Sequence, residues 1–175
     1  MKDKSIIPTS QERVMRENDF IVSKTDLTGR ITYGNRIFME FAGYSEKELL
    51  GEQHNIVRHP DMPRAAFSLA WDLIKSKQEF FGFVKNMASD GSYYWVFTHI
   101  TPSYSRDGKV IGYLSVRRKP NTSVLPTVAG LYKQMLDIEK SAGPRDAIEA
   151  STKFLLDFLA EKGTSYEELV LALQG

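Results

Sequence analysis

The sequence has 175 residues with a formal net charge of +1, and 42% of them are hydrophobic, a composition typical of one globular domain with an appendage. Positive and negative charges are interspersed, which disfavours a nucleic-acid or anionic-membrane partner. No apolar run reaches the length of a membrane span and no signal-peptide core begins the chain, so we expect a cytoplasmic protein. Because cysteine is absent, disulfides, thiolate metal sites, cysteine nucleophiles and cysteinyl photoadducts are excluded.

The first third of the chain predicts a β-hairpin followed by short helices. Residues 20–26 and 30–34 have the composition of strands and flank a turn that contains glycine. Apolar residues then recur at helical spacing over residues 37–42, and a glycine ends this helix. The next helix begins with the capping box Ser45-x-x-Glu48.

Residues 55–63 place a cation, an imidazole and a carboxylate, from Arg58, His59 and Asp61, beside two prolines. Each proline fixes its own φ and pushes the preceding residue towards extended geometry, so the segment is a stiffened loop. Asp61 also fits the N-cap preference of an amphipathic helix that runs to about residue 77. The N–H groups of a helix N-terminus and the Arg58 guanidinium suit an anionic or carbonyl-rich ligand, whereas simple helix capping is the alternative interpretation.

Three further strands are predicted over residues 80–87, 92–103 and 110–118. Asp-Gly turns of the kind that close antiparallel hairpins separate them. The helices before residue 80 all arise from one crossover, so they must lie on a single face of the sheet. The sequence therefore predicts an α+β fold with a five-stranded antiparallel sheet, helices on one face, and a pocket between the two layers.

Several motifs in this order resemble those of PAS domains. They are Asp26-Leu27-x-Gly29-Arg30-Ile31-x-Tyr33-x-Asn35, Gly43-Tyr44-Ser45-x-x-Glu48-Leu49-x-Gly51, Asp90-Gly91-x-x-Tyr94-Trp95 and Gly108-x-x-x-Gly112-Tyr113. More narrowly, the 55–63 loop with Val84-Lys85-Asn86 resembles the flavin-binding PAS domain of bacterial aerotaxis receptors. The resemblance covers residues 18–119, which we predict as a PAS sensor domain between an N-terminal cap segment, 1–17, and a C-terminal helical extension, 120–175.

The resemblance implies that the chain binds FAD non-covalently between helices and sheet and reports redox state or oxygen in signalling. It implies that these residues lie at or next to the flavin: Asn35, Arg58, His59, Asp61, Trp71 and Asn86. One departure is Phe80-Phe81-Gly82, which stands where those receptors typically have Trp-Ser-Gly and which changes the partner that stacks on the ring. Because strand side chains alternate, an inward Asn86 also implies an inward Phe80 and an outward Phe83.

Two alternatives to flavin binding stay open. The domain could be a cofactor-free PAS interaction module whose pocket is filled by side chains or binds another small ligand. It could also bind haem through His54, His59 or His99. The chain contains none of the hydrolase, zinc-protease, Walker or kinase motifs, so we do not expect an enzyme.

The outer face of the predicted sheet needs a cover, because strands 80–87 and 92–103 carry apolar residues at both alternating positions. We expect residues 10–16 to form a short covering helix and a second copy of the chain to complete the cover as a homodimer. The resemblance favours such a dimer, since the N-terminal helices of PAS domains often mediate dimerisation.

The apolar pattern of the C-terminal extension predicts three amphipathic helices, which follow a polar linker at residues 120–123. The first opens near Pro126, residues 141–144 separate it from the second, and the capping box Ser165-x-x-Glu168 begins the third. Their apolar faces must pack against each other, the sheet or a partner. The membrane anchor and coiled coil that follow this region in the receptors are not present, so we expect a sensor that signals in trans to a chemoreceptor or other signalling protein, or an excised input region.

Overall fold

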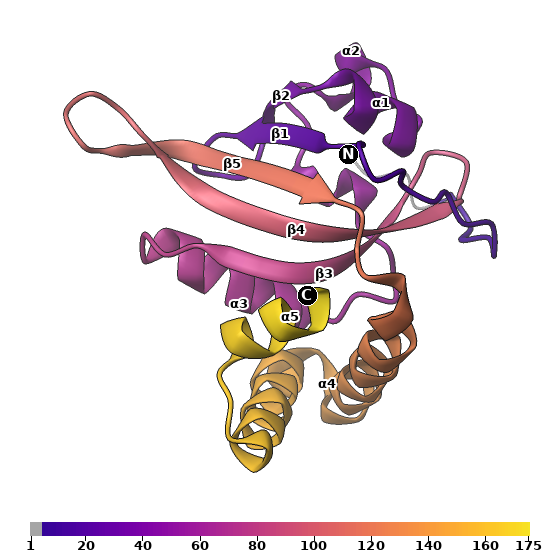
Figure 1. The fold of residues 1–175 in the computed structure, drawn as a ribbon, viewed down its shortest axis with the longest axis vertical. Helices are drawn as coiled ribbons and strands as arrows, with labels where there is room; N and C mark the ends of the chain where they lie inside the picture. The colour runs from indigo at the N-terminus through magenta and orange to yellow at the C-terminus, as the bar shows by residue number, and fades with distance from the viewer. Residues whose placement is uncertain (1–4) are drawn as a thin grey trace.

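The computed structural model describes residues 5–175, so the first four residues of the N-terminal cap segment lie outside the described part. At the centre is a five-stranded antiparallel sheet in the order β2-β1-β5-β4-β3, drawn in Figure 1. The strands are β1 (Ile21–Thr25), β2 (Ile31–Gly34), β3 (Phe80–Met87), β4 (Tyr93–Tyr104) and β5 (Val110–Arg118). Their ends lie at or next to the predicted ends, and the predicted α+β fold is confirmed.

The helices between β2 and β3 lie on one face of the sheet (Figure 1). They are α1 (Arg36–Ala42), α2 (Glu46–Leu49), the 3-10 helix η1 (His54–Val57) and α3 (Arg64–Lys75). The first of them, α1, ends as predicted at Gly43, which has the left-handed conformation that favours glycine. Its Phe38 side chain is fully buried against Ile21 of β1 and Tyr94 of β4 in an apolar cluster. Burial of this face joins the helical layer to the sheet.

The pairing of β1 with β5 directs a row of side chains towards the helices. The two strands pair antiparallel from Ile21 with Arg117 to Thr25 with Tyr113. They approach closely at Gly112, where a Cβ atom would lie 2.2 Å from the Thr25 carbonyl oxygen, so a side chain there would force the strands apart. Alternate residues of β5, Tyr113 and Arg117 among them, consequently face inward.

The N-terminal segment is extended, so the helix predicted over residues 10–16 is wrong. Its backbone pairs with the start of β4 instead. The Thr9 N–H donates to the Gly91 carbonyl oxygen and the Arg13 N–H to the Tyr93 carbonyl oxygen, both at 2.8 Å. These partners lie far along the chain, and local helix propensity carries no information about them.

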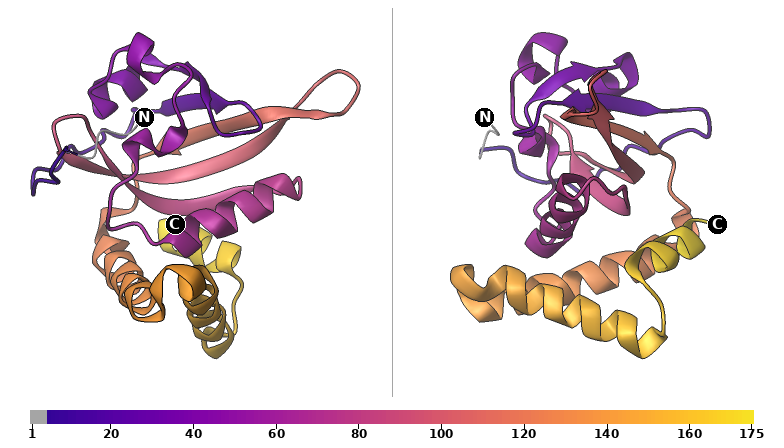
Figure 2. Two further views of the ribbon diagram at one scale, coloured as in Figure 1. Left: turned by 180° about the vertical axis from the view of Figure 1, so that it is seen from behind. Right: turned by 90° about the vertical axis from the view of Figure 1, so that its left-hand side faces the viewer.

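The C-terminal extension packs against α3 and β3 as a further layer, shown in Figure 2. It consists of the 3-10 helix η2 (Thr122–Val124), α4 (Leu125–Lys162) and α5 (Tyr166–Gln174). Gly143, with φ of 76° and ψ of 170°, interrupts α4, so the break predicted at residues 141–144 is confirmed. Over residues 5–175, no helix combines the length and the apolar character that a membrane crossing requires.

These helices also supply the cover that the outer face of the sheet needs. Phe83 of β3 and Trp95 and Phe97 of β4 are buried in one cluster with Val128 and Tyr132 of α4. The rings of Trp95 and Tyr132 stack with their centroids 6.3 Å apart. The Tyr132 hydroxyl donates a hydrogen bond to the Phe83 carbonyl oxygen at 2.7 Å. The C-terminal extension, and not an N-terminal helix, therefore covers this part of the face.

Candidate functional site

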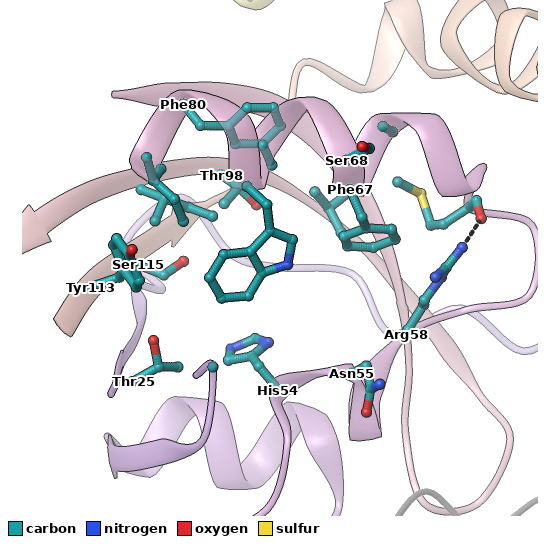
Figure 3. A pocket seen from close by; sticks show the side chains of 18 of the residues that line it. Thr25, His54, Asn55, Arg58, Phe67, Ser68, Phe80, Thr98, Tyr113 and Ser115 are labelled. Carbon is teal, nitrogen blue, oxygen red and sulfur yellow. Dashed lines mark hydrogen bonds between the residues drawn. The ribbon is translucent and has the colours of Figure 1, made fainter. Parts of the chain in front are cut away.

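A cavity of about 500 Å³ lies between the inner face of the sheet and the helices before β3, and its lining extends to Tyr132 and Ile148 of α4. Figure 3 shows side chains around it. The surface of its walls is largely apolar, and the aromatic side chains in it include Phe67 and Trp71 of α3, Phe80 of β3 and Tyr113 of β5. The Trp71 and Tyr113 rings meet edge to face with their centroids 5.6 Å apart. A cavity with this volume and lining is typical of small-molecule and cofactor sites.

Two of the polar residues predicted at the site line this cavity. Arg58 Nη2 donates to the Met62 carbonyl oxygen at 2.9 Å, the dashed line in Figure 3, and the guanidinium lies 4.5 Å from the Phe67 ring centroid. Asn86 lines the cavity from β3 and is 4% exposed. Its backbone pairs with that of Arg58 in an isolated antiparallel bridge. The loop is thereby fastened to β3 at the cavity wall.

The other predicted polar residues lie outside the cavity lining and take part in the surrounding framework. Asn35 Oδ1 accepts one backbone N–H from β1 and one from α1, both at 3.0 Å. His59 Nδ1 accepts the Asp61 N–H at 3.1 Å, and the Asp61 carboxylate pairs with Lys85 at 2.7 Å. Of the six predicted residues, the structure thus brings Arg58, Trp71 and Asn86 together at the cavity. A flavin contact of any of these six residues stays a prediction.

The start of α3 also differs from its predicted form, because Asp61 is not its N-cap. The N-cap is Pro63, which has no side-chain hydrogen bond to offer. Glu139 of α4 fills that role instead: its carboxylate accepts the N–H groups of Arg64 and Ala65, each at 3.0 Å. The anion that the helix N-terminus attracts therefore comes from the C-terminal extension.

A buried polar group that the sequence analysis did not single out lies at the cavity wall opposite α3. Arg117 of β5 is 2% exposed and donates through Nη2 to Ser23 Oγ of β1. Ser23 Oγ lies 3.1 Å from His54 Nε2, and all three residues line the cavity. The signal in the sequence was a charged residue at an inward position of a strand, since Arg117 shares its face with Ser115 and Tyr113.

Charge at this wall is confined to Arg117. Burial and the nearby guanidinium lower the pKa of His54 to about 3, so the imidazole is neutral at neutral pH. Burial lowers the pKa of Arg117 to about 10, which leaves the guanidinium charged. His54 is also the histidine that lines the cavity. His99 lies on β4 and contacts Glu79 at 2.7 Å, which leaves His54 as the candidate axial ligand for the haem alternative.

Comparison with known proteins relates this chain to one family. Residues 31–117 match the family described as the PAS fold. The chain is 39% identical over 127 residues to the aerotaxis receptor of Escherichia coli strain K12, covering 73% of this chain and 25% of the receptor. It is 31% identical over 102 residues to the nitrogen fixation regulatory protein of Klebsiella pneumoniae, covering 58% of this chain and 21% of that protein. The chain thus spans a quarter or less of the length of these relatives.

Solved structures share the fold at low sequence identity. A light-oxygen-voltage domain from a study of a flavin analogue has a TM-score of 0.56 and 21% identity, with 66% of this chain and 86% of that chain covered. A PAS domain from Colwellia psychrerythraea has a TM-score of 0.53 and 22% identity, with coverage of 57% and 85%. At these identities the likeness concerns the fold alone.

Proposed function

Residues 31–117 belong to the PAS fold family, and from that membership we propose that the chain is a signalling sensor that binds FAD non-covalently and reports redox state or oxygen. The observation that carries this proposal is the cavity of about 500 Å³, which joins aromatic walls to a few buried polar groups. The 39% identity to an aerotaxis receptor supports the aerotaxis type expected from the 55–63 loop and Val84-Lys85-Asn86.

The residues at the cavity suit the isoalloxazine ring of FAD. That ring is flat and mainly apolar and has one polar edge, so it needs aromatic walls and a few directed polar contacts. Phe67, Trp71 and Phe80 supply such walls. Asn86 can both donate and accept a hydrogen bond at the ring edge, and Arg58 lies beside it through their backbone pairing.

A route from the cavity to the C-terminal helices runs through β3. A bound flavin would supply a charge and a protonation state that change on reduction. Asn86 would hold the ring edge, and its amide can rotate to exchange donor and acceptor ends. Phe83, on the same strand, accepts the Tyr132 hydroxyl through its carbonyl oxygen. A displacement of β3 would therefore change the contact between β3 and α4.

We propose that the output is a change in protein contacts and not catalysis. The expected partners are a second copy of the chain, through the N-terminal segment and the outer sheet face, and a chemoreceptor or other signalling protein in trans. Val14 within the extended N-terminal segment and Phe20 just after it support the first, because their side chains stay 61% and 49% exposed. The cytoplasmic location stays a prediction from the sequence.

The absorption spectrum of the purified protein tests this function. Wild-type protein should be yellow or should take up added FAD with a flavin spectrum. Arg58→Ala should bind FAD at least tenfold more weakly with its circular dichroism unchanged, because a hydrogen bond to a charged group typically contributes about 1.5–3 kcal/mol. Arg36→Ala, on the exposed side of α1, is the control and should bind FAD as the wild type does.

Two results would contradict the assignment. A colourless wild-type protein that takes up no FAD would favour the cofactor-free interaction module. Equal FAD affinity in Arg58→Ala and the wild type would remove Arg58 from the binding site while leaving flavin binding in place.

A further inference from the structure

Arg117 is a buried cation at the cavity wall that lacks a balancing anion in the described part of the chain. Nη2 donates to Ser23, whereas Nε and Nη1 have no hydrogen-bond partner within residues 5–175. The guanidinium lies 4.8 Å from the Phe38 ring centroid, which offers only a weak attraction. A buried charge without a partner is costly, so a fold that retains one at a cavity wall indicates a ligand that compensates it.

The groups that face Arg117 from neighbouring elements bring no negative charge. His54 of η1 is neutral, as its lowered pKa requires. Burial raises the pKa of the Tyr94 phenol on β4, so that group is neutral as well. Ser23 on β1 and Phe38 on α1 carry no charge. Within residues 5–175 Asp72 of α3 also lines the cavity but makes no ion pair with Arg117, so a compensating anion would be a ligand in the cavity, which Arg117 lines.

We propose that Arg117 is the counter-cation for negative charge on the ligand ring and that it raises the reduction potential of bound FAD. This inference rests on the proposed function. Uptake of two electrons from a low-potential donor and one proton from solvent leaves one negative charge on the flavin ring. Arg117 stabilises that charge strongly, because a cation next to the ring in a low-dielectric site acts with little screening. The oxidised ring is neutral, so Arg117 stabilises it less than the reduced ring.

The strand supplies a matched control, because the next residue is also an arginine and points to the other face. Arg118 is exposed, with its guanidinium 5.3 Å from the Phe97 ring centroid on the outer face. Arg117→Met removes the buried charge and keeps an unbranched apolar chain in place of the arginine stem. Arg117→Lys keeps the charge. Arg118→Met makes the same loss of charge outside the cavity.

Anaerobic titration of the FAD-loaded protein with dithionite and reference dyes measures the reduction potential. Arg117→Met should weaken the binding of reduced relative to oxidised FAD at least tenfold, a fall in potential of about 30 mV for a two-electron couple. Arg117→Lys should keep most of the wild-type potential, and Arg118→Met all of it. An unchanged potential in Arg117→Met, or an equal fall in Arg118→Met, would overturn the proposal.

A second measurement needs no bound FAD. Removing an uncompensated buried cation should raise the Tm of FAD-free Arg117→Met above that of the wild type, whereas Arg118→Met should leave it unchanged. A lower Tm in Arg117→Met would mean that the cation is compensated within the protein, and the proposal would be refuted. Wild-type protein that takes up no FAD refutes the proposed function itself, whereas FAD-loaded protein with unchanged potentials refutes only the role of Arg117.

Discussion

Single residues at the cavity wall are held in defined charge states. His54 stacks on Phe38 with the ring centroids 5.7 Å apart and the planes 6° from parallel. Enclosure beside Arg117 keeps the imidazole neutral, so it meets Ser23 by a hydrogen bond and adds no second positive charge. At low pH this arrangement destabilises the folded state, because the buried imidazole cannot readily take up a proton.

The free energy of unfolding should therefore decrease in mild acid through His54. Its pKa is about 3 in the folded protein against about 6.5 when unfolded, so the unfolded chain binds a proton that the folded chain rejects. This loss begins as the pH falls through 6.5 and continues towards 3. Between pH 7 and 4.5 it should amount to about 2 kcal/mol, measured by urea unfolding of FAD-free protein.

The variant His54→Gln isolates this contribution from that of the carboxylates. The acid loss in His54→Gln should be smaller than in the wild type by about 2 kcal/mol. His99→Gln, on the outer face, controls for the removal of an imidazole and should keep the full loss. Identical pH profiles for His54→Gln and the wild type would show that His54 takes up its proton in the folded protein as easily as in the unfolded chain.

At the scale of elements, the N-terminus of α3 is completed by α4. Glu139 is 7% exposed and accepts the N–H groups of Arg64 and Ala65. A carboxylate at this position satisfies two N–H groups that the helix leaves unpaired and also interacts favourably with the helix dipole. Because α3 forms one wall of the cavity, this contact joins that wall to the C-terminal extension.

Glu139→Gln should destabilise the protein by about 1–2 kcal/mol. The amide keeps one acceptor oxygen, but its NH₂ group faces a second N–H donor, and the charge is lost. Equilibrium unfolding in urea measures the difference. Glu149→Gln, at an exposed position of the same helix, is the matched control and should unfold at the wild-type midpoint. The capping role would be wrong if both variants behaved alike.

The elements that the sequence predicted correctly are those with local signals. Strand composition, Asp-Gly turns and the break at Gly143 all act within a few residues, and the structure agrees. The two errors involve distant partners. The backbone of residues 10–16 pairs with β4, and the carboxylate that caps α3 is Glu139, more than 70 residues from the helix start. Neither partner is visible in a local pattern.

The site residues likewise divide into those that a local sequence pattern predicts and those that it does not. Trp71 and Asn86 line the cavity, since helix and strand periodicity direct their side chains, and their contact with a flavin stays a prediction. Arg117 belongs to a run of basic residues at the end of a strand, and such a run is typical of a strand end that is exposed to solvent. Its burial follows from the pairing of β5 between β1 and β4, and strand order is a property of the assembled sheet.

At the scale of the whole molecule, α4 touches both walls of the cavity. Glu139 holds the start of α3, and the Tyr132 hydroxyl holds β3 at Phe83. The linker before α4 is in turn fastened to the end of α5, because Asn121 Nδ2 donates to the Leu173 carbonyl oxygen at 2.9 Å. A change in cavity shape would therefore alter how firmly the linker is held.

Limited proteolysis of FAD-loaded protein should detect this change. Cleavage within residues 120–126 should differ between the oxidised and the dithionite-reduced protein, because reduction alters the hydrogen bonds at Asn86 and moves β3. Tyr132→Phe keeps the ring that stacks on Trp95 but loses the hydrogen bond to β3, so it should bind FAD and lose most of the difference. Tyr104→Phe, a hydroxyl loss at an exposed position, should keep it. Identical digestion of oxidised and reduced wild-type protein would show that the cavity does not signal through α4, whatever the variants do.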